Sequence, residues 1–112
     1  MFIDFDKIEI SVLPEFKGGT GVTKTKNFFD GVNKIMRGTL DVGCSIGYHM
    51  HENNSEIILI VSGQAKCLYD DGAEHLKAGD CHYCPMGHSH SLINNSETEP
   101  LCYFAVVSEH KV

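Results

Sequence analysis

Polar and apolar residues alternate along most of this 112-residue chain, and a period of two is typical of strands that bury one face. Turn pairs such as Asp30-Gly31 and Asp71-Gly72 separate the alternating segments. No stretch has a helical period long enough to predict a helix. The sequence therefore predicts an all-β antiparallel barrel or sandwich, with strands over residues 2–5, 8–12, 22–29, 34–42, 57–61, 64–69, 74–77 and 101–107.

The length and charge of the chain limit its organisation and its partners. A chain of 112 residues forms one domain, in which we expect N-terminal strands and loops over residues 1–33 and the barrel over residues 34–107. The net charge of −6 opposes nucleic-acid binding, which needs a basic patch. No segment approaches the roughly 20 apolar residues of a membrane span. The charged N-terminus does not resemble a signal peptide, so we predict a cytoplasmic protein.

The five cysteines, an odd number without an evident secretion signal, predict reduced thiols. Cys81 and Cys84 have the CxxC spacing of redox and zinc sites. On a strand, however, residues three apart point to opposite faces, and there is no second CxxC to complete a zinc site. We therefore expect buried packing residues, because a free thiol behaves as a small hydrophobe.

Two glycine-bounded segments contain the residue types of one metal site. His49 and His51 are two positions apart, so on a strand both imidazoles project from the same face. Glu56 opens the apolar run 57–61, where a carboxylate costs several kcal/mol unless a positive charge pairs with it. The second segment supplies a further histidine, His90. A divalent cation would provide the charge that neutral imidazoles lack.

These segments resemble the paired signature motifs of the cupin superfamily. The first motif is glycine, five residues, His-x-His, a short gap, glutamate, six residues and glycine, which here are Gly43, His49, His51, Glu56 and Gly63. The second is glycine, five residues, Pro-x-Gly, two residues, histidine, three residues and asparagine, which here are Gly79, Pro85, Gly87, His90 and Asn94. With their 15-residue spacer, the motifs cover about half of the chain.

The resemblance implies an all-β double-stranded β-helix, the jelly-roll barrel of cupins, with a metal inside it. Carried over to this sequence, it implies His49, His51, Glu56 and His90 as ligands, and Asn94 as a residue that secures a turn. Three imidazoles and one carboxylate suit Mn, Fe, Co, Ni, Cu or Zn rather than Ca or Mg, and leave the identity of the metal open. Four protein ligands leave one or two positions for a substrate oxygen, water or dioxygen.

Two further residues are candidates for contact with a substrate. His88 lies two positions before His90 and could support a ligand or touch a substrate, although its place on a turn equally fits an exposed histidine. Arg37 could clamp a substrate carboxylate, although a solvated charge on a strand is the more common role. For Tyr48 and Met50 we expect core or interface packing, and we assign no role to His75, His82 and His110.

Three kinds of function remain open. The first is a small metalloenzyme acting on an oxygen-bearing metabolite such as a sugar acid or oxo acid, for which the resemblance implies dioxygenase, decarboxylase, isomerase or lyase chemistry. The second is a module that binds or senses a small molecule without turnover, and the third is a dimeric scaffold. A free coordination position favours the enzyme. We also expect a homodimer, with segments 2–5 and 8–12 as candidate contacts, and no nucleic-acid or membrane partner.

Overall fold

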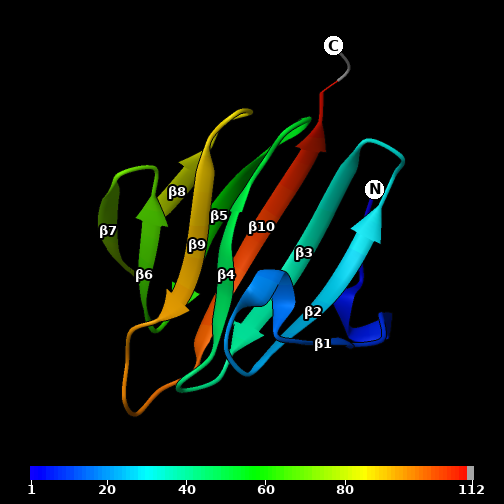
Figure 1. Cartoon of the computed structure of the whole chain (residues 1–112). Helices are drawn as coiled ribbons and strands as arrows, with labels where there is room; N and C mark the ends of the chain where they lie inside the picture. Colours follow the sequence, from blue (N-terminus) through cyan, green and yellow to red (C-terminus); the bar gives the residue numbers. More distant parts are fainter. Residues whose placement is uncertain (111–112) are drawn as a thin grey trace.

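The computed structural model of the chain describes residues 1–110, within which ten strands form two packed antiparallel sheets (Figure 1). The larger sheet has the strand order β1-β2-β3-β10-β5-β8, and the smaller has the order β4-β9-β6-β7. No helix in this described part is long and apolar enough to cross a membrane. In chain order the elements are η1 Phe5–Lys7, β1 Ser11–Pro14, η2 Phe16–Gly18, β2 Val22–Phe29, β3 Asn33–Leu40, β4 Ser45–Met50, β5 Asn54–Ser62, β6 Gln64–Tyr69, β7 Gly72–Lys77, β8 Cys81–Cys84, β9 Ser89–Asn94 and β10 Leu101–Glu109.

The barrel interior lies between the two sheets and is filled by alternate side chains of the strands. On β10, Leu101, Tyr103 and Ala105 are buried, while the residues between them are partly exposed. The buried apolar side chains form one cluster with contributions from both sheets. The predicted all-β antiparallel barrel is therefore confirmed, and its core follows the period of two seen in the sequence.

The interior has two chemically different ends. The closed end is defined by three apolar side chains that are at most 1% exposed, namely Leu40, Ile60 and Leu101. Asn94, the last residue of β9, seals this end, because its Nδ2 atom donates to the backbone carbonyls of Leu40 and Glu99 at 2.9 Å each. The expectation that Asn94 secures a turn is thus confirmed. Near its other end β9 carries His90, which defines the open end.

The N-terminal segment differs from the sequence prediction. Residues 2–5 form no strand; instead the side chain of Asp4 accepts a hydrogen bond from Asp6 N at 3.2 Å and caps the 3-10 helix η1. The strand expected over 8–12 starts later, because β1 runs Ser11–Pro14 and includes the proline. Proline is tolerated there since β1 is an edge strand, where a missing N–H need not break a ladder. Of the other predicted strands, β2 and β6 have the predicted ends, and β3, β5, β7 and β10 are present with shifted ends.

The cysteines are free thiols, and the CxxC pair diverges as predicted. Cys81 is exposed and Cys84 is buried, so the two side chains lie on opposite faces of β8. Burial raises the pKa of Cys67 to about 12 and that of Cys84 to about 11, so both remain protonated packing residues. The expectation of burial is wrong for Cys81, because the alternation along β8 turns it outward.

Candidate metal centre

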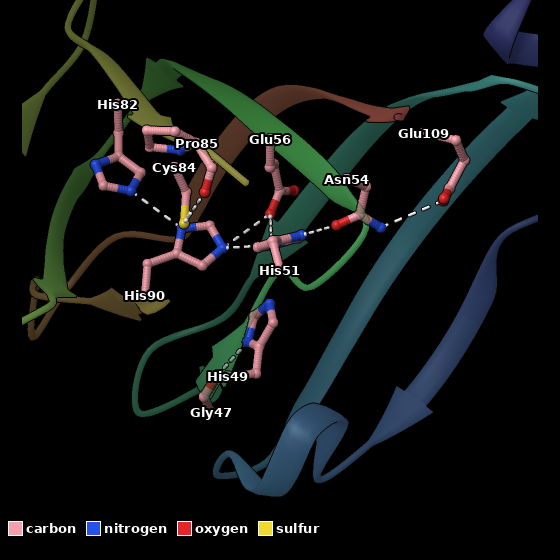
Figure 2. Close-up of polar contacts among 10 residues, drawn as sticks. All are labelled: Gly47, His49, His51, Asn54, Glu56, His82, Cys84, Pro85, His90 and Glu109. Carbon is pink, nitrogen blue, oxygen red and sulfur yellow. Dashed lines mark hydrogen bonds and ion pairs between the residues drawn. The ribbon is translucent and has the colours of Figure 1, made fainter. Parts of the chain in front are cut away.

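Four side chains with metal-ligating atoms converge at the open end of the barrel. His49 lies on β4, His51 directly follows that strand, Glu56 lies on β5 and His90 on β9. His49 and His90 are cross-strand partners, which places their side chains next to each other. One ligand atom of each residue lies within 4.8 Å of the other three, and such a group could hold a metal ion. Figure 2 shows His51 and His90 directed at the Glu56 carboxylate, with His49 nearby.

The two histidines of the first motif are held by hydrogen bonds from their outer nitrogens. His49 Nδ1 donates to the carbonyl oxygen of Gly47 at 2.7 Å. His51 Nδ1 donates to Asn54 Oδ1 at 2.5 Å, and Asn54 Nδ2 donates to Glu109 Oε1 at 3.2 Å. A neutral imidazole has one N–H and one lone pair, so these bonds leave the lone pair on Nε2. Both lone pairs are then free to bind a metal inside the barrel.

Glu56 is the charged centre of the group and is 9% exposed. Its Oε1 atom lies 3.3 Å from His51 Nε2 and 3.0 Å from His90 Nε2, and these nitrogens are 2.9 Å apart. Burial raises the pKa of Glu56, but the close contacts with His51 and His90 outweigh burial and lower the pKa to about 2. A carboxylate and two facing lone pairs repel one another unless a positive species lies between them. The donor set therefore fits a divalent cation.

The two histidines of the first motif differ in their affinity for a proton. Burial lowers the pKa of His49 more than its hydrogen bond to Gly47 raises it. Burial also acts to lower the pKa of His51, but hydrogen bonds to Glu56 and Asn54 outweigh it, so this pKa is raised. A metal would consequently compete with a proton mainly at His51, and binding would release that proton.

A cavity of about 150 Å³ adjoins the group and is lined by both polar and apolar side chains. His49, His51 and Glu56 contribute to its lining, and η2, β2 and β3 contribute further polar residues, which we call the polar wall. In the described part of the chain, three buried side-chain atoms lack a hydrogen-bond partner, and two of them, Thr25 Oγ1 and Asn27 Oδ1, belong to this wall. Two lysines, Lys17 and Lys34, also line the cavity. The wall therefore offers hydrogen bonds and positive charge to a small polar ligand.

The two residues considered for substrate contact lie elsewhere. The His88 ring contacts Asp70 Oδ2 through Nδ1 at 2.6 Å and stacks on Tyr69 with 5.7 Å between ring centroids. Arg37 lies over the ring of Phe5, 5.8 Å from its centroid, and lines a separate hollow of about 280 Å³. The structure thus places neither residue among those that line the histidine cavity.

Tyr48 and Met50, for which packing was expected, are half-exposed, and Tyr48 Oη donates to the carbonyl oxygen of Asp70 at 3.1 Å. The sequence prediction also missed the polar wall. Thr25 and Asn27 alternate with two lysines on β2, so both faces of that strand are polar and the pattern alone does not say which face is inside. The sequence therefore carries no signal that separates Thr25 and Asn27 from the lysines beside them.

Comparisons with known proteins agree with this architecture. A family model of the cupin domain matches residues 36–107. An oxalate-binding protein of Thermotoga maritima is 38% identical over 69 residues, which are 61% of this chain and 55% of that protein, so the match spans little more than half of the relative.

Solved structures extend the likeness to the whole fold. A predicted oxalate decarboxylase from Thermotoga maritima has a TM-score of 0.89 at 26% identity, over 97% of this chain and 99% of that one. The protein KdgF from a Halomonas species has a TM-score of 0.80 at 17% identity, over 99% and 96% of the two chains, and is similar in fold. Because the family model covers residues 36–107 of 112, the chain belongs to the cupin family.

Proposed function

We propose that this protein binds a divalent transition metal through His49, His51, Glu56 and His90, and that it is an enzyme acting on a small carboxylate anion at that metal. The metal would be Mn, Fe, Co, Ni, Cu or Zn, which accept imidazole and carboxylate together. The observation that carries this proposal is the convergence of four ligand atoms within 4.8 Å around one buried carboxylate. A proton can satisfy one facing lone pair, whereas a metal satisfies all of them.

The charge of the cavity supports an anionic substrate. The chain as a whole has a net charge of −6, yet Lys17 and Lys34 both line this cavity. A volume of about 150 Å³ suits a molecule of a few heavy atoms rather than a sugar polymer. The names of the two Thermotoga relatives, an oxalate-binding protein and a predicted oxalate decarboxylase, make oxalate the first compound to test. Other small oxo acids share its carboxylate.

The groups that line the cavity would each make a different contact with the substrate. A bound metal supplies a Lewis acid that polarises a substrate oxygen. Lys17 and Lys34 neutralise the charge of the substrate, and the Thr25 hydroxyl donates a hydrogen bond to an oxygen of its far end. Asn27 Oδ1 accepts a hydrogen bond from a hydroxyl or from a protonated carboxyl group.

A carrier that binds the anion without turnover is the second candidate, and one observation favours it. Among the described residues that line the cavity, Glu56 is the sole carboxylate, and it is already assigned to the metal. A reaction that needs a separate acid would have to use another group. Tyr103 also lines the cavity, but burial raises the pKa of its phenol, so it holds its proton tightly.

The first experiment is elemental analysis of protein purified without added metal, with His51→Ala as the control. We expect about one transition metal per chain in the wild type and much less in the variant, because His51 supplies a ligand atom. Equal metal content in both proteins, or none in the wild type after incubation with each candidate metal, would contradict the proposal.

The second experiment titrates metal-loaded protein with oxalate and with acetate. Lys17→Met should weaken oxalate binding about five- to tenfold, because it removes a nearby positive charge. Lys24→Met is the matched control, since Lys24 pairs with Asp41 at 3.6 Å and lines the other hollow. Release of carbon dioxide or formate would support the enzyme, and binding without product would support the carrier.

The homodimer expected from the sequence stays a proposal, for which we favour a different face. Ile57, Leu59 and Val61 of β5 and Tyr83 of β8 are 39–57% exposed on neighbouring strands of the larger sheet. Apolar side chains that gather on an open sheet face favour contact with a second copy. Light scattering should give a dimer mass for the wild type and a monomer mass for Leu59→Lys, whereas Val42→Lys should leave the mass unchanged.

A further inference from the structure

The outer nitrogen of His90 is held by a second buried imidazole rather than by a backbone or amide oxygen. His82 Nε2 lies 3.0 Å from His90 Nδ1, and the two rings are nearly parallel, with 19° between their planes and 5.2 Å between centroids (Figure 2). His82 Nδ1 lies 2.7 Å from Oε1 of Glu74, whose side chain is 45% exposed. The three residues come from β9, β8 and β7, and both imidazoles are at most 2% exposed. A continuous chain of hydrogen bonds therefore runs from the metal site to the surface.

The chemistry of these groups determines where each hydrogen lies. A carboxylate only accepts, so the hydrogen between Glu74 and His82 is carried by His82 Nδ1. A neutral His82 then has its lone pair on Nε2, which makes His90 Nδ1 the donor of the next bond. His90 Nε2 is left with the lone pair, and that atom faces Glu56 Oε1 at 3.0 Å.

We propose that Glu74 and His82 are positioning residues that hold His90 in the tautomer able to bind the metal. This inference rests on the metal site of the proposed function and assigns a role to two residues outside it. The first-motif histidines obtain the same tautomer directly from neutral oxygens, the Gly47 carbonyl and the Asn54 amide. At His90 the hydrogen-bond partner is an imidazole with two tautomers of its own, so the tautomer of His90 depends on the Glu74 carboxylate beyond His82.

A competing arrangement makes the proposal testable. If His82 instead carried its hydrogen on Nε2, it would donate to His90 Nδ1, and His90 Nε2 would then present an N–H toward Glu56. That N–H occupies the position in which a metal needs a lone pair, so His90 would no longer be a ligand. Glu74 disfavours this arrangement, because it would leave His82 Nδ1 without a hydrogen to donate.

The first test observes the tautomers directly in metal-free protein. Long-range 15N–1H spectra, recorded where the histidines are neutral, should show hydrogens on Nδ1 of both His82 and His90 in the wild type. Glu74→Ala should convert His82 to a mixture of tautomers, and His90 should follow it. A hydrogen on His82 Nε2 in the wild type would overturn the proposal. This test needs no bound metal, so it remains informative even if the proposed function fails.

The second test measures the affinity for Zn²⁺ by competition with a chelator. Glu74→Ala and His82→Phe should each weaken binding about 10- to 100-fold, as expected when the partner of a ligating histidine is removed. Glu74→Gln keeps an accepting oxygen and should stay close to the wild type. His82→Gln can still accept from His90 and donate to Glu74, so it should recover part of the loss and serves as well if His82→Phe misfolds.

Asp71→Ala is the matched control, because it removes an exposed carboxylate three residues from Glu74 on the turn before β7. It should change Zn²⁺ affinity less than twofold. An equal loss for Asp71→Ala and Glu74→Ala would attribute the effect to net charge and overturn the proposal. Unchanged affinity in both His82 variants would do the same. A wild type that binds no Zn²⁺ or other metal would instead count against the proposed function alone.

Discussion

The closed end and the open end of the barrel interior are built by the same strands but treat polar groups in opposite ways. At the closed end Asn94 uses both sides of its amide: Nδ2 donates to two carbonyls, and Oδ1 accepts from Ser96 N at 2.8 Å. At the open end the buried Asn27 Oδ1 and Thr25 Oγ1 have no partner within the described chain. A buried amide whose hydrogen bonds are made within the chain stabilises the fold, whereas a buried polar atom without such a bond can hydrogen-bond to a ligand.

A single strand can carry residues that stabilise the fold at one end and residues that could bind a metal at the other. β9 carries His90 near one end, Leu92 in the middle and Asn94 at the other end, and all three are buried. Functional sites often depart from the rules of core packing, and in this barrel two buried polar side chains without a partner in the described chain, Thr25 and Asn27, line the cavity at the open end. We therefore expect substitutions at the closed end to alter folding with little effect on metal binding, and substitutions at the open end to do the reverse.

The largest effect on folding should come from Leu101→Ala at the closed end. Leu101 is 0% exposed and faces Leu40 across the β10–β3 pair, so truncation leaves a cavity. We expect a loss of about 2–5 kcal/mol in the free energy of unfolding. Urea denaturation of metal-free protein measures this change. The folded variant should still bind about one metal per chain. Loss of the metal would show that the closed end also affects metal binding.

Asn94→Ala should have the next largest effect, because it removes three hydrogen bonds at once. The carbonyls of Leu40 and Glu99 would lose their donor, so we expect a loss of about 1–3 kcal/mol. Asn27→Ala at the open end is the control and should cost less, since Asn27 Oδ1 has no partner in the described part to lose. Equal losses in the two variants would show that the ends do not differ in this respect.

The four-residue group could be predicted because its members belong to two short motifs with fixed spacing. His49 and His51 share a face by strand periodicity, and the motif spacing identifies Glu56 and His90 as candidate partners. The polar wall could not be predicted in the same way, because it depends on how β2 pairs with β3. Thr25 is opposite Gly38, where a side chain would collide with the ring of Tyr103.

The role of His82 was missed for a related reason. Its inward direction follows from alternation with the buried Cys84 on β8, which the sequence does indicate. Its partners lie on β7 and β9, however, and these strands belong to the other sheet. No spacing in the sequence relates residues that meet only when two sheets pack.

At the N-terminus, a capping aspartate overrode an alternating pattern, because one local hydrogen bond there outweighs a weak tendency to form a strand.

Two threonines on one strand give a smaller but closely matched test of the comparison. Thr23 and Thr25 are 1% and 4% exposed, and neither hydroxyl has a partner in the described chain. Replacing either with valine removes an unsatisfied hydroxyl, so both variants should gain up to about 1 kcal/mol in stability. Only Thr25 lines the histidine cavity. Thr25→Val should therefore weaken oxalate binding severalfold, whereas Thr23→Val should not, and equal binding by both would exclude Thr25 as a contact.

Asp70 should give the smallest effect, because it is exposed. It supports the turn that precedes His90: its Oδ2 atom accepts from His88 Nδ1 at 2.6 Å and its Oδ1 atom from Ser89 N at 3.2 Å. The hydrogen bond from His88 is the main reason that the pKa of Asp70 lies below its ordinary value of 3.8. A carboxyl group whose pKa is lowered by folding stabilises the protein above its unfolded pKa and loses this contribution as pH falls through the folded value.

Asp70→Asn should consequently reduce the fall in melting temperature of metal-free protein between pH 5 and roughly pH 3, because the titrating group is gone. Asp71→Asn, at the next position of the same turn, is the charge control. If both variants flatten the profile equally, the contact with His88 contributes nothing. If only Asp70→Asn flattens the profile and the metal content is unchanged, Asp70 stabilises the fold at the open end without contributing to metal binding. The groups that bind the metal are then those inside the barrel.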